Sequence, residues 1–327
     1  MDSTPPANPC SAPSFSDLPD REPAFIAEPH FPLGSLVVLE GPRGAGKSWI
    51  AADLAAFVSR EKECFGKVLF IGSPASLTNA VKPRLQAAGA DFSRIKVVEP
   101  SRVFSEEDGV RYLNLTLLSG FLSQEGPSLL VIDPIDPYVN KKMGKFAEML
   151  RDMAIEYECT ILAVRRLPQT PTGRPAKTGP EDISFWADSV VLCARDPENP
   201  NKRLLAHARS VLAPEAKTTE FSIEEGKIRW GNVREMTAEE LLQALRPKGP
   251  ADALAATIDF LKERIEAGER EAWHLQWDAR EAGISGITLR RAKMALRLRS
   301  FKKDGRWHWE FPAKPEEKDD HLEELDG

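Results

Sequence analysis

Residues 36–48 read LVVLEGPRGAGKS, and this stretch decides the fold. Residues 36–39 are a short apolar run rich in valine and leucine, which predicts a strand. Residues 41–48 match the pattern GxxxxGK[ST] in full, and residues 48–60 follow with apolar side chains at helical spacing. A strand, a glycine loop and a helix in this order predict a phosphate-binding loop, or P-loop, in which backbone N–H groups and the helix N-terminus surround a phosphate.

The chemistry of a P-loop gives these residues roles. Lys47 would contact the β- and γ-phosphates, and the Ser48 hydroxyl would ligate Mg²⁺. A strand beside the P-loop strand in such proteins ends in an acid that holds the magnesium shell through water. We predict Asp133 as that acid, with Asp136 as the fallback, and expect ATP and Mg²⁺ as cofactors. The predicted nucleotide-binding residues are Gly41, Pro42, Arg43, Gly44, Ala45, Gly46, Lys47, Ser48 and Trp49.

Strands and helices alternate after the P-loop. Predicted strands lie at 67–71, 95–98, 129–133 and 160–164, and a helical segment lies at 146–158. This order predicts an α/β fold with a mostly parallel sheet covered on both faces. After residue 189 the apolar runs follow without room for helices, so we expect the sheet to end in antiparallel strands.

Composition predicts five parts. Residues 1–30 are rich in proline and predict a disordered arm, and residues 313–327 form an acidic, disordered tail. Between them we expect an ATP-binding domain at 31–245, a linker at 246–251 and a small domain at 252–312. The 327 residues are 42% hydrophobic with no apolar stretch of 18 residues, and we do not expect the first residues to act as a secretory signal. The four cysteines form no CxxC pair, so we expect a cytoplasmic protein with reduced thiols and no membrane partner.

The small domain carries a local basic excess in a chain of net charge −6. Predicted helices at 254–265, 273–281 and 288–298 and a hairpin at 301–311 give the order of a winged helix-turn-helix. Helix 288–298 would enter a DNA major groove, with the hairpin on phosphates. The alternative is a protein-docking domain whose basic face is merely solvated. The candidate DNA-binding residues here are Arg290, Arg291, Lys293, Arg297, Lys302, Lys303 and Arg306.

The loop at 165–182 is long and rich in proline and glycine. It follows a predicted central strand, where α/β sheets present their sites. It is either a second DNA-contacting segment or merely flexible. Its candidate DNA-binding residues are Arg165, Arg166, Arg174 and Lys177.

Four segments together resemble RecA-like ATPases of the RepA type, which are related to the hexameric helicases of plasmid and phage replication. The segments are FPLGSLVVLEGPRGAGKSWIAADLA (31–55), SLLVIDPIDPYV (128–139), SVVLCARDPENPNKRLLAHARSVLAP (189–214) and AREAGISGITLRRAKMALRLRSFKKDGRWHWEFP (279–312). The resemblance implies a RecA-like P-loop core with a C-terminal winged domain, DNA as a partner, and self-association, for example into a hexamer. It implies that Asp133 is the Walker B acid and that Arg209 reaches the nucleotide of a neighbouring subunit.

Two departures from this family concern hydrolysis. Members carry a glutamate just after the second strand that activates the attacking water, but residues 72–77 contain no acid. Polar sensor residues usually follow the strand that ends at Val164, where this chain has Arg165 and Arg166. Glu40 is the only substitute for the missing glutamate that we identify. The chain is therefore expected to be either an oligomeric, helicase-like ATPase of replication or repair, or a nucleotide-dependent DNA-binding or regulatory protein with weak or no hydrolysis.

Overall fold

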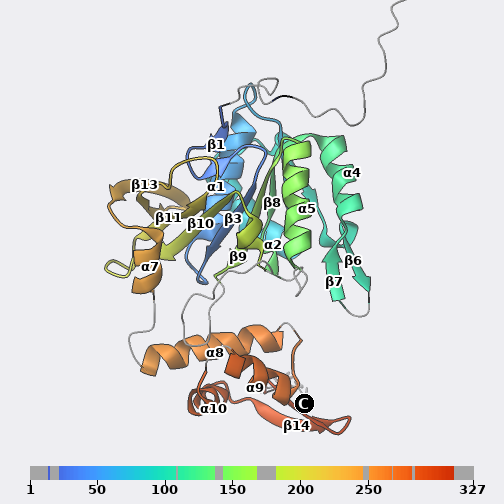
Figure 1. The fold of residues 1–327 in the computed structure, drawn as a ribbon, viewed down its shortest axis with the longest axis vertical. Helices are drawn as coiled ribbons and strands as arrows, with labels where there is room; N and C mark the ends of the chain where they lie inside the picture. The colour runs from blue at the N-terminus through green and yellow to red at the C-terminus, as the bar shows by residue number, and fades with distance from the viewer. Residues whose placement is uncertain are drawn as a thin grey trace, which may run out of the picture.

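The computed structural model describes residues 14, 22–107, 110–136, 143–167, 182–245, 250–266, 268–281 and 284–312. A nine-stranded sheet forms the centre of the larger part of the molecule (Figure 1). Its strands in spatial order are β13 (Lys227–Arg234), β12 (Thr218–Glu224), β11 (Arg203–Ser210), β10 (Ser189–Arg195), β3 (Leu36–Gly41), β9 (Thr160–Arg166), β8 (Pro127–Ile132), β4 (Lys67–Ile71) and β5 (Ile95–Val98).

The strands from β10 to β5 are all parallel, and β11, β12 and β13 continue the sheet antiparallel, as the sequence predicts. One neighbour relation differs from the expectation. The strand that ends before Asp133, β8, is not adjacent to the P-loop strand β3, because β9 lies between them. Parallel strands end at the same edge of a sheet, so Asp133 still comes close to the P-loop.

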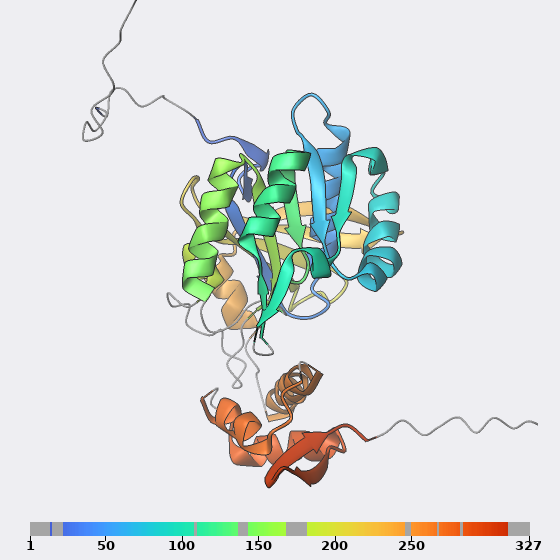
Figure 2. The ribbon, with the colours of Figure 1, turned by 90° about the vertical axis from the view of Figure 1, so that its right-hand side faces the viewer.

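Two layers of apolar side chains cover the sheet. Along β3, Val37 and Leu39 belong to the cluster that includes α1 (Lys47–Arg60), while Leu36 and Val38 belong to the cluster with α4 (Leu115–Glu125) and α5 (Met143–Glu156). Successive strand residues point to opposite faces, so a wholly apolar strand is buried on both sides. Figure 2 shows α4 and α5 on the face turned toward the viewer.

The N-terminal segment differs from the predicted disordered arm within its described part. β1 (Phe25–Ala27) pairs with β2 (Phe31–Pro32), and the side chains of Ile26 and Phe31 join the core against α1. The prolines flank these two apolar residues without preventing their burial. Of the predicted arm, all residues except 14 and 22–30 lie outside the described residues.

Several short elements have no counterpart in the sequence prediction. They are the helices α2 (Pro74–Ser76), α3 (Lys82–Ala87), α6 (Ile183–Trp186) and α7 (Ala238–Ala244), the π-helix Leu77–Val81, the 3₁₀ turns Phe92–Arg94 and Pro100–Arg102, and the hairpin of β6 (Phe104–Glu107) and β7 (Val110–Leu113). Such pieces are too short for periodicity to identify.

The C-terminal segment has the predicted order of three helices and a hairpin. These are α8 (Pro250–Glu266), α9 (Ala272–Glu281), α10 (Gly286–Ala295), β14 (Arg299–Lys303) and β15 (Arg306–Glu310). They enclose a core of their own that includes Leu261, Leu275, Leu289 and Trp309. Pro250 is already part of α8, so the predicted linker extends less far than expected. None of the described helices is long and apolar enough to cross a membrane.

Candidate nucleotide-binding site

The P-loop connects the end of β3 to the start of α1. Gly44 and Gly46 have φ angles of 75° and 113°, in the left-handed region that favours glycine. A Cβ atom at Gly41 would lie 1.9 Å from the carbonyl oxygen of Cys193 on β10, so only glycine fits there. The Lys47 ammonium donates to the carbonyl oxygens of Gly41 (2.7 Å) and Pro42 (2.8 Å), which holds it over the loop.

The structure brings the two predicted magnesium-site residues together. The Ser48 hydroxyl donates a hydrogen bond to the Asp133 carboxylate, which follows β8. Burial raises the pKa of Asp133, and the bond from Ser48 and the nearby Lys47 oppose that rise. A hydroxyl and a carboxylate are oxygen ligands of the kind that Mg²⁺ prefers. These residues are therefore of the chemical kind that suits a magnesium ion, and direct ligation by Ser48 with Asp133 acting through water stays a prediction.

Asp136 lies close to the same site. Its Oδ2 atom accepts a hydrogen bond of 3.0 Å from the backbone N–H of Arg166, and its charge acts on Lys47. Burial raises the pKa of Asp136, while the Arg166 hydrogen bond opposes the rise. Asp136 is thus a second carboxylate, besides Asp133, whose charge acts on Lys47.

Glu40, the predicted substitute for the missing glutamate, is tied to Arg165. The two residues are direct neighbours on the parallel strands β3 and β9. Glu40 Oε2 accepts from Arg165 Nε (2.9 Å), from Arg165 Nη2 (2.7 Å) and from the Ser184 hydroxyl (3.1 Å). Arg165 also pairs with Asp182, at 2.9 Å. Three donors on one buried oxygen leave this carboxylate poorly placed to activate water, so we withdraw Glu40 as a catalytic residue.

The same ion pair removes Arg165 from the predicted DNA-binding residues, because only 7% of its side chain is exposed. Arg166 is different: 40% of its side chain is exposed, and it pairs with Glu263 of α8 at 3.0 Å. This pair links the C-terminal segment to the edge of the sheet that carries the P-loop. Arg174 and Lys177 lie outside the described residues.

Three arginines near the P-loop were not singled out by sequence reasoning: Arg84, Arg195 and Arg203. Arg84 of α3 lies over the Trp49 ring, with 4.7 Å between its guanidinium carbon and the ring centroid, and its charge acts on Asp133. Burial lowers the pKa of Arg84, while Asp133 opposes that shift. The signal in the sequence is weak, because the short α3 follows a π-helix and gives no clear period.

Arg195 and Arg203 lie on the other side of the P-loop. They are direct neighbours on β10 and β11. A Cβ atom at Gly44 would lie 3.8 Å from the Arg195 guanidinium, and one at Gly46 would lie 3.0 Å from the Arg203 side chain. Among the described residues, the buried Nε atom of Arg203 has no hydrogen-bond partner. Two like charges directly opposite each other on adjacent strands repel each other. The arginine pair therefore concentrates positive charge beside the P-loop, where a phosphate would relieve the repulsion.

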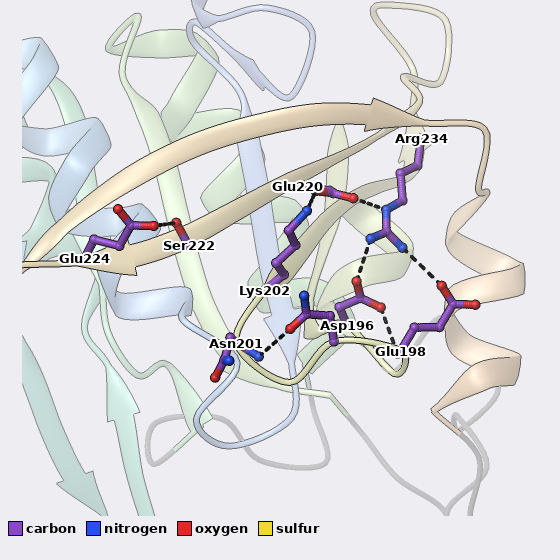
Figure 3. A network of polar contacts seen from close by, with 9 residues as sticks. Asp196, Glu198, Asn201, Lys202, Glu220, Ser222, Glu224 and Arg234 are labelled. Atoms are coloured by element: carbon purple, nitrogen blue, oxygen red, sulfur yellow. Dashed lines mark hydrogen bonds and ion pairs between the residues drawn. The ribbon is translucent and has the colours of Figure 1, made fainter.

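A polar network holds the connection between these two strands (Figure 3). Arg234 on β13 donates to Asp196 (2.6 Å) and to Glu220, and Lys202 donates to the second oxygen of Glu220 (2.6 Å). Asp196 is 2% exposed. The loop that joins Arg195 to Arg203 is therefore fixed by charges from β12 and β13.

Arg209 lies at the opposite end of β11 from Arg203. Arg209 is paired with Val190 on β10, and Val190 is paired with Val38 on β3. Val38 comes before the P-loop in the chain, so Arg209 lies away from the end of β3 where the loop begins. Its guanidinium donates to the carbonyl oxygen of Ala187, and its buried Nε atom has no partner within the described chain. Arg209 therefore does not reach the nucleotide site of its own chain.

The predicted DNA-binding residues of the C-terminal segment divide into two groups. Lys293 donates to the Ser300 hydroxyl (2.6 Å) and lies over the Trp309 ring, and Arg306 pairs with Glu271 at 2.9 Å, so both have partners within the segment. The other group is exposed and makes no ion pair within the described residues. It consists of Arg290, Arg291, Arg297, Lys302 and Lys303.

Comparison with known proteins identifies the family of the P-loop domain. A family model described as an AAA domain matches residues 7–170, half of the chain. Among solved structures, a KaiC-like protein from the hyperthermophilic archaeon Pyrococcus horikoshii OT3 is similar, with 20% sequence identity and a TM-score of 0.46 over 62% of this chain and 91% of that chain. A search of curated proteins found no match. By its match to the family model, this chain belongs to the AAA domain family, a group of RecA-like P-loop ATPase domains.

Proposed function

We propose that this protein binds ATP with Mg²⁺ at the P-loop, hydrolyses it slowly, and uses the bound nucleotide to control binding to DNA. One observation carries the proposal: Lys47, Ser48 and Asp133 are assembled for binding, whereas Glu40 is held by Arg165 and residues 72–77 contain no acid. Binding chemistry is therefore present without the usual water-activating carboxylate.

The slow rate of ATP hydrolysis follows from the loss of the rate enhancement that a positioned general base provides. A general base or a water-positioning group typically raises a rate by about 10²–10⁴. Without it, turnover falls well below one per second, against a typical enzyme median of about 10 s⁻¹. Asp136 is the remaining carboxylate whose charge acts on Lys47, and its bond to the Arg166 amide engages its Oδ2 atom. We assign residual hydrolysis to Asp136.

The DNA part of the proposal rests on the charges of α10 and β14 that make no ion pair with any described residue. Arg290 and Arg291 are exposed on α10, and Lys302 and Lys303 are exposed on β14. A helix and a hairpin with free cations suit a duplex, with base edges read by the helix and phosphates held by the hairpin. Arg166 and Glu263 connect this segment to the nucleotide site and offer a route for control.

A second candidate is a helicase-like motor that works as an oligomer. It is favoured by Arg209, which lies away from its own P-loop and whose Nε atom has no partner in the described part of the chain, so that its guanidinium could complete the site of a neighbouring copy. A motor requires fast, DNA-stimulated hydrolysis, which the missing carboxylate disfavours.

A third candidate is protein docking by the C-terminal segment. Ile287 and Met294 are 69% and 71% exposed, and they flank Arg290 and Arg291 on one side of α10. Apolar side chains of this kind are common in protein interfaces, although a thymine methyl group also accepts them.

Phosphate release under steady-state conditions separates these candidates. The rate is measured with Mg²⁺ and ATP alone, with single-stranded DNA and with duplex DNA, and the mass in solution is measured with and without an ATP analogue. We expect tight binding, turnover below about one per second, and duplex binding that depends on nucleotide and weakens with salt. Rapid DNA-stimulated hydrolysis by a hexamer would favour the motor, and absence of salt-dependent DNA binding would favour protein docking.

A further inference from the structure

A cavity of about 620 Å³ lies behind the P-loop helix, between the β1–β2 hairpin, α1 and the β12–β13 hairpin. None of the residues that line it belongs to the P-loop at 41–48. Its volume is within the range of about 300–1,000 Å³ that small-molecule sites occupy. Most of its wall is apolar, including Ile26, Phe31, Ile50, Leu54, Phe57 and Trp230.

Among the charged side chains that line this cavity, the two cations bond to groups outside it, whereas the two carboxylates make no ion pair with a described residue. Arg60 donates to the carbonyl oxygens of Ala88 and Gly89, and Lys217 pairs with Glu235. Within the described residues, Asp53 and Glu28 make no ion pair. The cations that line the cavity are therefore engaged elsewhere, while the carboxylates remain available to an occupant.

Asp53 lies on α1 among apolar side chains. Burial raises the pKa of Asp53, while a hydrogen bond donated by the Trp230 indole and the charge of Arg60 oppose the rise. Trp230 is 50% exposed and Phe57 is 37% exposed. A carboxylate beside aromatic rings is the arrangement that favours an organic cation, because charge pairing and cation–π attraction act together.

His30 adds a second polar group without a partner. It lines the same cavity, is 8% exposed, and its buried Nε2 atom has no hydrogen-bond partner among the described residues. Burial, with His207 nearby, lowers the pKa of His30 to about 4, so the ring is neutral near pH 7. A neutral imidazole can present its Nε2 atom as an acceptor to an N–H donor.

We propose that this cavity binds a small organic cation, an amine with an apolar body, whose ammonium group pairs with Asp53 while its body fills the space between α1 and the β12–β13 hairpin. The ammonium group supplies several N–H donors, which suits two carboxylates and an imidazole better than an anion or a neutral molecule would. This site is separate from the nucleotide site, although α1 also begins at the P-loop.

A matched pair of probes tests the charge requirement. Binding of 4-phenylbutylamine and of 4-phenylbutan-1-ol to the full chain is measured by ligand-observed NMR at pH 7. We expect the amine to bind at least about tenfold more tightly, since the ion pair is partly desolvated. Asp53→Asn keeps the shape and still accepts the Trp230 hydrogen bond, and it should remove that preference. Asp259→Asn, the same change at an exposed position on α8, should leave it intact.

Two further variants separate the amine site from the nucleotide site and from self-association. Lys47→Ala should retain amine binding even where nucleotide binding is abolished, so the two proposals fail separately. Equal affinity for the amine and the alcohol, or an unchanged preference in Asp53→Asn, would overturn the amine site. It would also be overturned if neither probe binds while Val233→Asp at the cavity rim lowers the mass in solution, because a second copy of the chain would then fill the cavity.

Discussion

The edge of the sheet around the P-loop and the surface formed by α10 and β14 are both rich in arginine and lysine, but their charges are used differently. At the sheet edge, Arg165 is buried on Glu40, and Lys47 is held by two backbone carbonyls. On α10 and β14, Arg290 and Lys302 are exposed without an ion pair among the described residues. A cation paired with a buried carboxylate, such as Arg165, reports on the fold, whereas a cation without such a carboxylate is available to a ligand.

The first and largest expected effect concerns Arg165. Arg165→Ala leaves the buried Glu40 and the half-buried Asp182 without a cation, which should cost about 3–5 kcal/mol of unfolding free energy. Arg166→Ala is the matched control, because its pair with Glu263 is exposed and should be worth at most about 1 kcal/mol. Urea denaturation followed by circular dichroism compares the two variants. Equal midpoints would show that the Glu40–Arg165 pair does not stabilise the sheet.

The second prediction concerns Lys47. Lys47→Ala should weaken binding of a fluorescent ATP analogue by about 2–3 kcal/mol, or roughly 30–150-fold, because its charge-assisted hydrogen bonds to phosphates are removed. Lys82→Ala, the same change at an exposed position of α3, should leave the affinity within about twofold of the parent. If both variants bind equally well, the nucleotide does not occupy this loop.

The third prediction restores the missing carboxylate. Pro74 follows the Ser73 cap at the start of α2, and an acid is favourable in the first turn of a helix. Pro74→Glu should raise the rate of phosphate release by about tenfold or more if its carboxylate reaches the attacking water. Pro74→Gln introduces a side chain of nearly the same size as glutamate without the charge and should stay at the parent rate. Equal rates for the two variants would show that residues 72–77 do not lie beside the attacking water.

The smallest expected effect concerns the C-terminal surface. Replacing Arg290 and Arg291 with alanine should reduce the slope of log K against log salt for duplex binding by about 1.8, or about 0.9 for each phosphate that is no longer neutralised. Lys293→Gln should change that slope by less than about 0.5, since Lys293 is already bonded to Ser300. A larger change of slope at Lys293 than at the arginine pair would show that Lys293, and not Arg290 and Arg291, neutralises the DNA phosphates.

Glu40 and Arg165 illustrate why part of the site could not be predicted. Both residues lie one position before the end of a strand, so sequence reasoning placed them correctly at the carboxyl edge of the sheet. It could not place β9 directly beside β3, and this neighbour relation alone creates the ion pair. Arg84 and Trp49 were missed as a pair for the same reason, since 35 residues separate them and only the packing of α3 brings them together.

The sequence by itself determined the P-loop, the alternation of strands and helices, and the order of the C-terminal elements. These features depend on local patterns: fixed spacing of glycines, periods of apolar side chains, and turn residues. The tertiary structure decided which charges remain free. It inserted β9 between β3 and β8, buried Arg165 while exposing Arg166, and moved Arg209 to the edge away from its own P-loop. Whether a charged side chain is paired depends on its neighbours in space. When those neighbours are distant in the sequence, no local sequence pattern predicts them.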